Sequence, residues 1–561
     1  MSKSFADRGF HEYQVAKWVV LDGDIDAEWI ESMNTVMDDN KVLTLVSNER
    51  VPLSPSMRMV FEINSLKNAT PATVSRAGIL YINEVDIGWR PLMETWVQHR
   101  KSAAERNYLP SLFERYIETL QEMTRRGYKE VTNIRIINKV STIIYLLEGL
   151  LSSIPEDKLS ADSIEMVFAF SAMWAFGGPM VVEKALDHRK KFSEEFRSAF
   201  GGKIPKEGLC FDYFYNIQSG EYVHWQTEVP KHVPVKIGNK PGEAPFNSIF
   251  VETVESVRLM YLLNKLARNG RQVMFAGNTG TGKTEIIKKY LNGLDKTTDG
   301  MITKSIVMSY YTSADTLQQE IEVYIDKRSG TFFGPPMGKK MVFFIDDMNL
   351  PYVETYGTQN SIALLTQHLQ HGSIFDRNDL GMRKHLVDIQ YIAAMNPTAG
   401  SFEICERCQR HFATFAVSMP SHADLTNIFA AVFGGHLETF QPIIQDLTGK
   451  IVNAAIQVHE AVSSKFLPSA VKFMYNWNMR ELTNVFQGCC NATDQFYIKP
   501  EMMIRLFIHE TKRVYCDHLV SEQEMEAFDI LFKDIVKKTW RIFSSKIMQM
   551  YFKKTISTIT K

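Results

Sequence analysis

The chain has no excess of either charge, and it is poor in cysteine. Its 561 residues include 63 basic and 64 acidic side chains, which gives a formal net charge of −1 at pH 7. This balance creates no field that would attract nucleic acid or an anionic membrane surface, so we expect neither as a partner. Six cysteines in this length predict reduced thiols. Cys405 and Cys408 have no second pair at a suitable distance, which argues against a zinc site.

Long apolar runs and sustained heptads are also missing. No hydrophobic run approaches the length needed to cross a bilayer, and the polar opening Met1–Arg8 is unlike a secretion signal. No heptad pattern persists over several repeats, which excludes a long coiled-coil stalk within this sequence. Hydrophobic residues make up 45% of the chain, so we expect several folded globular domains.

What the chain does contain is a phosphate-binding motif. The apolar stretch Val273–Ala276 runs directly into the pattern Gly-x-x-x-x-Gly-Lys-Thr, and an amphipathic stretch follows. The glycines let the backbone curl so that its N–H groups point at phosphate oxygens, the lysine reaches the β- and γ-phosphates, and the threonine hydroxyl binds Mg²⁺. The residues predicted to bind ATP or ADP are Gly277, Asn278, Thr279, Gly280, Thr281, Gly282, Lys283 and Thr284.

A pair of acids follows the next strongly apolar stretch. Met341–Asp347 reads as a buried strand that ends in two carboxylates. Asp346 is predicted to hold Mg²⁺ through water, together with Thr284. Asp347 stands where a glutamate usually polarises the attacking water. We therefore expect it to act as the catalytic carboxylate, but with a lower rate of hydrolysis than a glutamate would give.

Two more segments complete the order found in nucleotide-hydrolysing cores. Ile389–Asn396 is an apolar strand, and the amide of Asn396 is placed to contact the γ-phosphate or the water. Arg410 lies just before the apolar stretch Phe412–Ser418 and is predicted to project out of the module. Each segment alone could be an ordinary buried strand with a polar end. The four segments in this order predict a nucleotide site.

This order resembles the AAA+ family of P-loop ATPases. The resemblance implies an α/β fold, in which large domains with a parallel sheet flanked by helices are each followed by a helical small domain. In that family the small domain supplies a second sensor arginine, and Asn476–Gly488 matches the helix that carries it. Arg480 then takes a catalytic position; the alternative is a surface arginine at a helix start. The segment that packs on adenine in similar proteins makes Val251 and Thr253 expected nucleotide contacts.

An earlier, incomplete copy of the same pattern, called the first copy below, lies nearer the N-terminus. It predicts strands at Lys17–Asp22, at Arg58–Ile63 and, after an arginine, within Thr73–Asn83. This copy has no P-loop, and Gly23 takes the place of the carboxylate that activates water. We expect it to complete a binding site without hydrolysing. The residues that correspond to Asp346, Asn396 and Arg410 are Asp22, Asn64 or Glu62, and Arg76.

The two copies resemble the second and third ring modules of dynein heavy chains. The second-module motifs are WVVLDGDIDAEWIESMNTVMDDNK (18–41) and ATPATVSRAG (69–78), and the third-module motifs are FIDDMNLPYVETYG (344–357) and MNPTAGSF (395–402). Asp347 and the sequence NPTAGSF (396–402) are closer to axonemal than to cytoplasmic dyneins. Among axonemal chains, an outer-arm β-type chain is favoured. The resemblance extends from about residue 10 to about residue 540.

The dynein resemblance implies a regulatory ATP site in a microtubule motor ring of cilia or flagella. The expected partners are other AAA+ modules of the same heavy chain, dynein intermediate and light chains, and microtubules, at a cytoskeletal location in the axoneme. Arg76 would be the arginine finger for a preceding module and Arg410 the finger for the incomplete first module. The finger for the site of Lys283 would come from a following module, so we expect either a fragment of a longer protein or a truncated gene model.

A freestanding AAA+ remodelling ATPase or chaperone is the alternative function, and the missing P-loop of the first copy argues against it. The expected division of the chain is a partial large domain at 1–90, a helical small domain at 91–200, a hairpin and linker at 201–248, a complete large domain at 249–420, a second small domain at 421–515 and a helical extension toward the next module at 516–561. The extension is predicted as a long amphipathic helix, Glu522–Phe552, leaving the ring.

Overall fold

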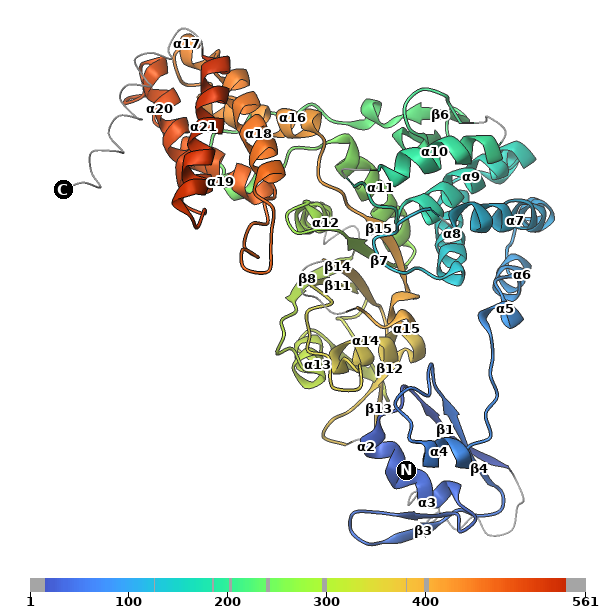
Figure 1. Ribbon diagram of the computed structural model, residues 1–561. Coiled ribbons are helices and arrows are strands. Elements are labelled where there is room, and N and C mark those ends of the chain that lie inside the picture. The colour runs from blue at the N-terminus through green and yellow to red at the C-terminus, as the bar shows by residue number, and fades with distance from the viewer. Residues whose placement is uncertain are drawn as a thin grey trace.

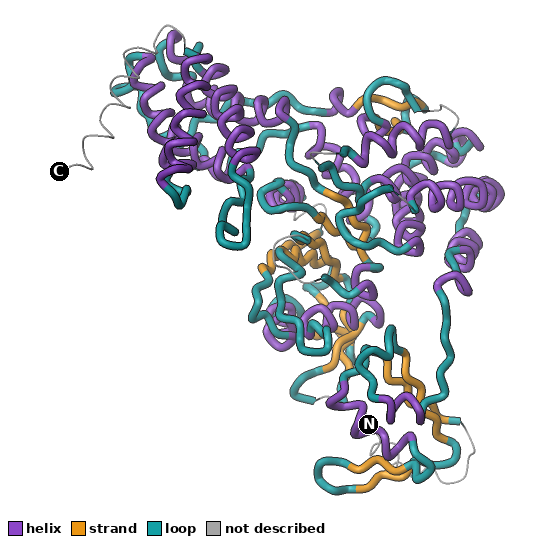
Figure 2. Tube along the Cα trace, viewed as in Figure 1, coloured by secondary structure: helices purple, strands orange, loops and turns teal. Residues whose placement is uncertain are grey.

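The fold combines a central parallel sheet with two groups of helices and a separate, smaller α/β unit near the N-terminus (Figure 1). The computed structural model describes residues 16–125, 127–183, 186–200, 204–238, 243–294, 300–379, 381–397 and 403–540. Figure 2 shows that the long strands gather in the central sheet and in the N-terminal unit, whereas the C-terminal group is helical.

The central sheet has five strands, and all of its pairs are parallel. Its strands are rich in buried apolar residues on both faces, as expected for a parallel sheet covered on both sides. This confirms the predicted α/β class. In their spatial order the strands are β15 (Phe412–Ala416), β7 (Gln272–Ala276), β14 (Ile389–Met395), β11 (Lys340–Asp346) and β8 (Met301–Val307).

Successive side chains of each strand point to opposite faces, so the sheet joins two cores. Val273 and Phe275 belong to the core that contains α11 (Val254–Arg268) and α12 (Lys283–Asn292). Met274 and Ala276 belong to the opposite core. The helices on that side are α13 (Ala314–Glu322) and α14 (Asn360–His371).

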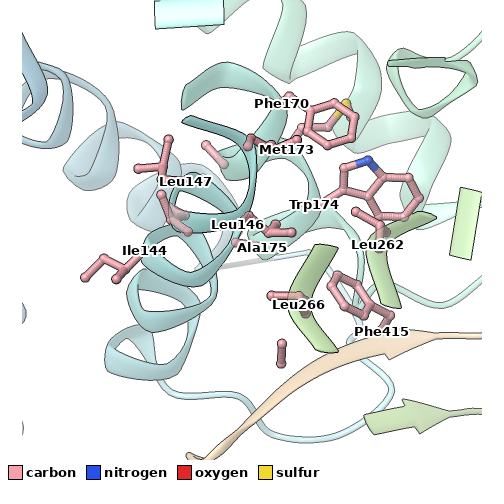
Figure 3. Packing of buried hydrophobic residues seen from close by; sticks show 14 of the residues in the cluster. Ile144, Leu146, Leu147, Phe170, Met173, Trp174, Ala175, Leu262, Leu266 and Phe415 are labelled. Carbon is pink, nitrogen blue, oxygen red and sulfur yellow. The ribbon is translucent and has the colours of Figure 1, made fainter. Parts of the chain in front are cut away.

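The first helical group packs directly on this large domain. Trp174 of α9 lies 6.1 Å from Phe415 of β15, between ring centroids, in an edge-on contact, and Figure 3 shows Ile144, Leu147, Leu262 and Leu266 in the same packed region. One continuous core therefore joins the small domain of the first copy to the large domain of the second. The helices of the group are α6 (Arg90–Gln98), α7 (Ala103–Thr124), α8 (Ile136–Leu151), α9 (Ala161–Gly177) and α10 (His188–Ala199).

The second helical group has a core of its own, and one prediction about it is wrong. The helix expected to leave the ring, α21 (Glu522–Thr539), instead packs against α18 with Phe528, Phe532 and Val536 buried. Its apolar stripe thus completes the small domain; the predicted continuation to Phe552 lies outside the described residues. The other helices are α16 (His422–Leu437), α17 (Pro442–Gln445), α18 (Thr448–Lys465), α19 (Met479–Cys489) and α20 (Pro500–Thr511).

The N-terminal unit contains two of the three strands predicted for the incomplete copy. β1 (Lys17–Asp22) and β4 (Met57–Glu62) pair in parallel. The prediction of a third strand after Arg76 is wrong: residues 77–83 form no strand, and Leu80 is 91% exposed. In the complete copy the equivalent strand, β15, is an edge strand whose partner among the described strands is β7. The described part of the first copy contains no strand equivalent to β7, so this segment has no ladder to join.

Several short strands and helices lie outside the central sheet and the two helical groups. Strands β5 and β6 form the hairpin that was predicted between the modules. A separate sheet of four short strands has the order β12-β13-β10-β9. The bounds are α2 (Ala27–Ile30), α3 (Asn34–Met37), β2 (Val42–Thr44), β3 (Arg50–Pro52), α4 (Pro71–Arg76), α5 (Glu84–Ile87), β5 (Tyr213–Asn216), β6 (Glu221–His224), β9 (Asp326–Ser329), β10 (Phe332–Gly334), β12 (Ser373–Phe375), β13 (Arg383–Leu386) and α15 (Glu406–Gln409).

Candidate functional site

The predicted phosphate loop connects the end of β7 to the start of α12. Gly280 and Gly282 have φ angles of 74° and 90°, a backbone region that residues other than glycine rarely adopt. Gly277 has a different reason to be glycine, because a Cβ there would lie 2.2 Å from the carbonyl oxygen of Val417. The loop is thus shaped by backbone geometry and by the close approach of the segment that follows β15.

Lys283, the first residue of α12, turns back into the loop. Its Nζ donates to the carbonyl oxygens of Gly277 and Asn278, both at 2.7 Å. Burial lowers the pKa of this lysine to about 8, although the nearby carboxylates of Asp347 and Asp346 oppose the shift. The lysine therefore sits where an anion held by the loop would meet its charge.

The two residues predicted to hold Mg²⁺ lie in contact. The hydroxyl of Thr284 is 3.2 Å from Oδ1 and 3.0 Å from Oδ2 of Asp346, at the carboxyl end of β11. A hydroxyl and a carboxylate are hard oxygen donors of the kind that Mg²⁺ prefers, so the pair fits the ion. Asp347 follows in the left-handed region at φ 54°, and burial and the charge of Asp346 raise its pKa.

The sensor residues approach from two domains. Nδ2 of Asn396, directly after β14, donates to Oγ1 of Thr279 in the loop. From the small domain, Arg480 at the start of α19 lies close enough for its charge to lower the pKa of both Lys283 and Asp347. Asn396 thus contacts the loop directly, and the charge of Arg480 acts on Lys283 and Asp347; the contacts of both side chains with a γ-phosphate stay predictions.

The small domain also touches the loop through a residue that the sequence analysis missed. A Cβ on Gly280 would lie 2.4 Å from Oδ1 of Asn478, which caps α19 by accepting from the backbone N–H of Arg480 at 2.8 Å. Asn478 is therefore both the helix cap and the point at which the small domain rests on the loop. Its position two residues before Arg480, as an N-cap residue type, was the available signal.

The residues expected to contact adenine have a less direct relation to the loop. Thr253 caps α11, accepting at its side chain from the backbone N–H of Ser256 at 3.3 Å. Val251 is half-buried two residues earlier. Among the described residues, neither makes a hydrogen bond to the phosphate loop. Their contact with a nucleotide stays a prediction.

Arg410 lies at a second cleft, between the two copies. A cavity of about 290 Å³ is bordered by the strand ends of the first copy, by its small domain and by α15 of the second copy. Arg410 lines this cavity, whereas Arg76 lies elsewhere and pairs with Asp38. That Arg410 serves a nucleotide site of the first copy stays a prediction. Other lining residues are Asp24, Glu62, Asn64, Asn133, Arg135 and Arg407.

Arg407 is a further residue of this cleft that sequence reasoning missed. It forms an ion pair with Asp22, the acid at the end of β1, and lies 3.8 Å from Glu62 at the end of β4. The preceding residue, Glu406, accepts from Nε of Arg135 at 3.0 Å, in the small domain of the first copy. The helix α15 thus contacts both domains of the preceding copy. The spacing of three residues between Arg407 and Arg410 was the only sequence signal.

Comparison with known proteins identifies the family. The chain is 41% identical over 546 residues to the protein named "Dynein beta chain, flagellar outer arm" of Chlamydomonas reinhardtii, and 42% identical over 527 residues to "Dynein axonemal heavy chain 17" of Mus musculus. The alignments cover 96% and 93% of this chain. The chain belongs to the dynein heavy chain family. It spans 12% of the length of each of these relatives.

Family models divide this dynein chain in agreement with the structure. Residues 239–420 match the P-loop containing dynein motor region, residues 109–227 match the dynein heavy chain AAA lid domain, and residues 451–550 match the AAA+ lid domain. The last range includes α21, which supports its place in the small domain. The AAA+ motor region implies nucleotide binding, and the phosphate loop lies inside it.

The described residues of this dynein chain contain neither a membrane-spanning helix nor a cluster of metal-binding side chains. No described helix is both long and apolar enough to cross a membrane. No group of three or more histidine, cysteine or acidic side chains in the described part of the chain is arranged to hold a metal ion. Cys408 is buried and Cys405 exposed, and neither belongs to such a group.

Proposed function

We propose that this chain contributes a regulatory ATP site to the motor ring of an axonemal dynein. The proposal rests on one observation: two domains meet at the phosphate loop, where the large-domain residue Asn396 donates to Thr279 and the small-domain residue Asn478, the cap of the helix that begins with Arg480, lies against Gly280. ATP and ADP differ only in the γ-phosphate, and contacts to it from two domains would exist in one nucleotide state alone. The angle between the domains would then depend on which nucleotide is bound.

Mg²⁺ would accompany the nucleotide at Thr284 and Asp346. When bound, the ion would neutralise charge between the β- and γ-phosphates. Lys283 would bind the same phosphates, and Asp347 would orient the attacking water. Val251 and Thr253 would contact the base. Arg410, joined by Arg407, would reach the site of the preceding module, and Arg76 would serve a module beyond it.

The relatives supply the proposed setting. Their names place them in flagellar outer arms, cilia and axonemes, and we extend an axonemal location to this chain. Its nearest partners would be other AAA+ modules of the same heavy chain. Intermediate chains, light chains and microtubules would be partners through the parent protein. A freestanding chaperone is disfavoured, since relatives about eight times longer match the chain over almost its whole length.

A complete motor ring carrying Arg480→Ala or Asn396→Ala tests the regulatory role. Couplings between distant sites are typically about 1–3 kcal/mol, so we expect microtubule-stimulated ATPase activity and gliding speed to change about fivefold or more. Lys450→Ala, which removes an exposed cation from the same small domain, should leave both unchanged. Unchanged motility in both sensor variants, with nucleotide still bound, would instead indicate a static structural nucleotide.

The lowered pKa of Lys283 predicts a pH dependence of nucleotide affinity. Below its pKa of about 8 the free site is charged, and as pH rises through that value the lysine loses its proton. Affinity for an anionic nucleotide should therefore fall above pH 8, approaching tenfold per pH unit. Titration of a fluorescent nucleotide between pH 7 and pH 9.5, each limit being about one unit or more from that pKa, measures the effect.

Lys283→Arg is the matched control for this profile, because arginine stays charged over the whole range. Its affinity at neutral pH is expected to be lower, since the guanidinium differs in shape, but its profile should be flat. Parallel profiles for the wild type and Lys283→Arg would show that another group titrates.

A further inference from the structure

Asn349 lies where the acidic strand leaves the sheet. The backbone turns outward at Asp347, in the left-handed region, and returns at Met348, whose N–H donates to the carbonyl oxygen of Ala394 at 3.0 Å. The side chain of Met348 is fully buried in the core between the sheet and the helices α13 and α14. Asn349 therefore follows a residue that is anchored to the sheet by its backbone and its side chain, two positions after Asp347.

The side chain of Asn349 prolongs the pairing of β11 with β14. It is 1% exposed, and its Nδ2 donates to the carbonyl oxygen of Asn396 at 2.9 Å. In this way a side-chain amide supplies the next rung after the backbone of β11 has left the ladder. The backbone of Asn396 is tied to the same turn that carries Asp347.

The carbonyl oxygen of the same side-chain amide is expected to reduce the stability of the fold. Oδ1 of Asn349 is buried and has no hydrogen-bond partner among the residues that the structure describes. A buried acceptor without a partner is destabilising, so a polar side chain here needs a reason other than stability. The hydrogen bond to Asn396 offers one, because the side chain of Asn396 in turn donates to Thr279 of the phosphate loop.

We propose that Asn349 is a positioning residue that fixes the sensor amide of Asn396 relative to Asp347. The sequence of contacts runs from the acidic turn through Asn349 to the carbonyl of Asn396, and from its side chain to the loop. With Asn349 in place, the groups that face the γ-phosphate and the water keep one spacing. The inference rests on the proposed nucleotide site and goes beyond it by assigning ATP-against-ADP discrimination to a residue that touches neither.

The variants Asn349→Leu and Asn349→Ser test this role in the full 561-residue chain. Leucine keeps the volume without the donor, and serine is too short to reach Asn396, so one variant remains informative if the other does not fold. We expect the affinity for ADP to stay within about twofold while the ratio of ATP to ADP affinity falls on the order of tenfold, as for a weakened hydrogen bond to a charged phosphate.

Gln359→Leu is the matched control. Gln359 is also a buried amide, 6% exposed, and its Nε2 donates to a backbone carbonyl, that of Pro351, at 2.9 Å. No described contact joins it to Asn396 or to the phosphate loop. Gln359→Leu removes a buried amide hydrogen bond to a backbone carbonyl, as Asn349→Leu does, but it should leave the ATP/ADP ratio unchanged. An equal change in ratio would reduce the role of Asn349 to general packing.

A double variant separates action through Asn396 from any other route. If Asn349 works through the sensor, Asn349→Leu combined with Asn396→Ala should discriminate no worse than Asn396→Ala alone. Additive losses, or an unchanged ratio in both single Asn349 variants, would overturn the inference while leaving the nucleotide site intact. Absence of ADP binding by the wild-type chain would instead overturn the proposed function.

Discussion

Replacing Lys283 by alanine is expected to weaken binding of ATP and ADP by about 10–150-fold. A charge-assisted hydrogen bond contributes about 1.5–3 kcal/mol, and the lysine is the only cationic side chain within residues 277–284. In the structure its Nζ already lies inside the loop, bonded to two backbone carbonyls. A titration of fluorescent nucleotide in the presence of Mg²⁺ measures the change.

Lys288→Ala is the matched control for this variant. Lys288 lies on the same helix, α12, but its side chain is 50% exposed and pairs with Glu285 at 3.5 Å. Removing it takes away the same charge from the chain without touching the loop, so affinity should change less than about twofold, as expected for a solvent-screened surface charge. Equal affinity of Lys283→Ala and the wild type would contradict the assignment of the phosphate site.

The site could be predicted where its parts are continuous in sequence. The phosphate loop, the two acids and Asn396 each stand at the end of an apolar strand, and the ends of parallel strands meet at one edge. No such rule locates Arg407, because its partner Asp22 lies 385 residues away. Asn349 and Asn478 look like ordinary turn and cap residues until the fold brings them to their contacts.

The two errors about elements have a common physical cause. An apolar stripe shows which face of a helix is buried but not against what, so α21 was expected to leave a domain whose core it completes. The apolar residues after Arg76 favour a strand, yet a strand also needs a neighbouring ladder. In both cases the local pattern was read correctly, and the missing information was the identity of the partner.

Turnover by the purified chain is expected to be slow or absent, far below a typical enzyme rate of about 10 per second. Asp347 is one methylene shorter than the glutamate that it replaces, and its backbone is fixed by the turn at φ 54°. Its carboxylate should therefore stand about 1 Å short of the ideal water position, a misplacement that can reduce the rate on the order of 10²-fold.

A missing arginine finger should slow the reaction further. Among the described residues, Arg480 is the one arginine whose charge shifts the pKa of Lys283 or Asp347, and it comes from the same module. Fingers supplied by a neighbour accelerate other P-loop enzymes by about 10³-fold or more. The two effects together would reduce turnover on the order of 10⁵-fold, which leaves the site in one nucleotide state for long periods.

Steady-state phosphate release checks this rate, and Asp347→Glu checks its cause. Because the glutamate restores the missing reach, its rate should rise above the wild type by up to about 10²-fold, while the missing finger still keeps it slow. Asp346→Asn, which removes the predicted Mg²⁺ carboxylate, should abolish whatever release comes from this site and so exposes contaminating activity. Release near 10 per second from the wild-type chain would show that Asp347 reaches the water unaided. A site that turns over so rapidly would follow the ATP supply of its surroundings and could not hold one nucleotide state long enough to regulate a neighbour.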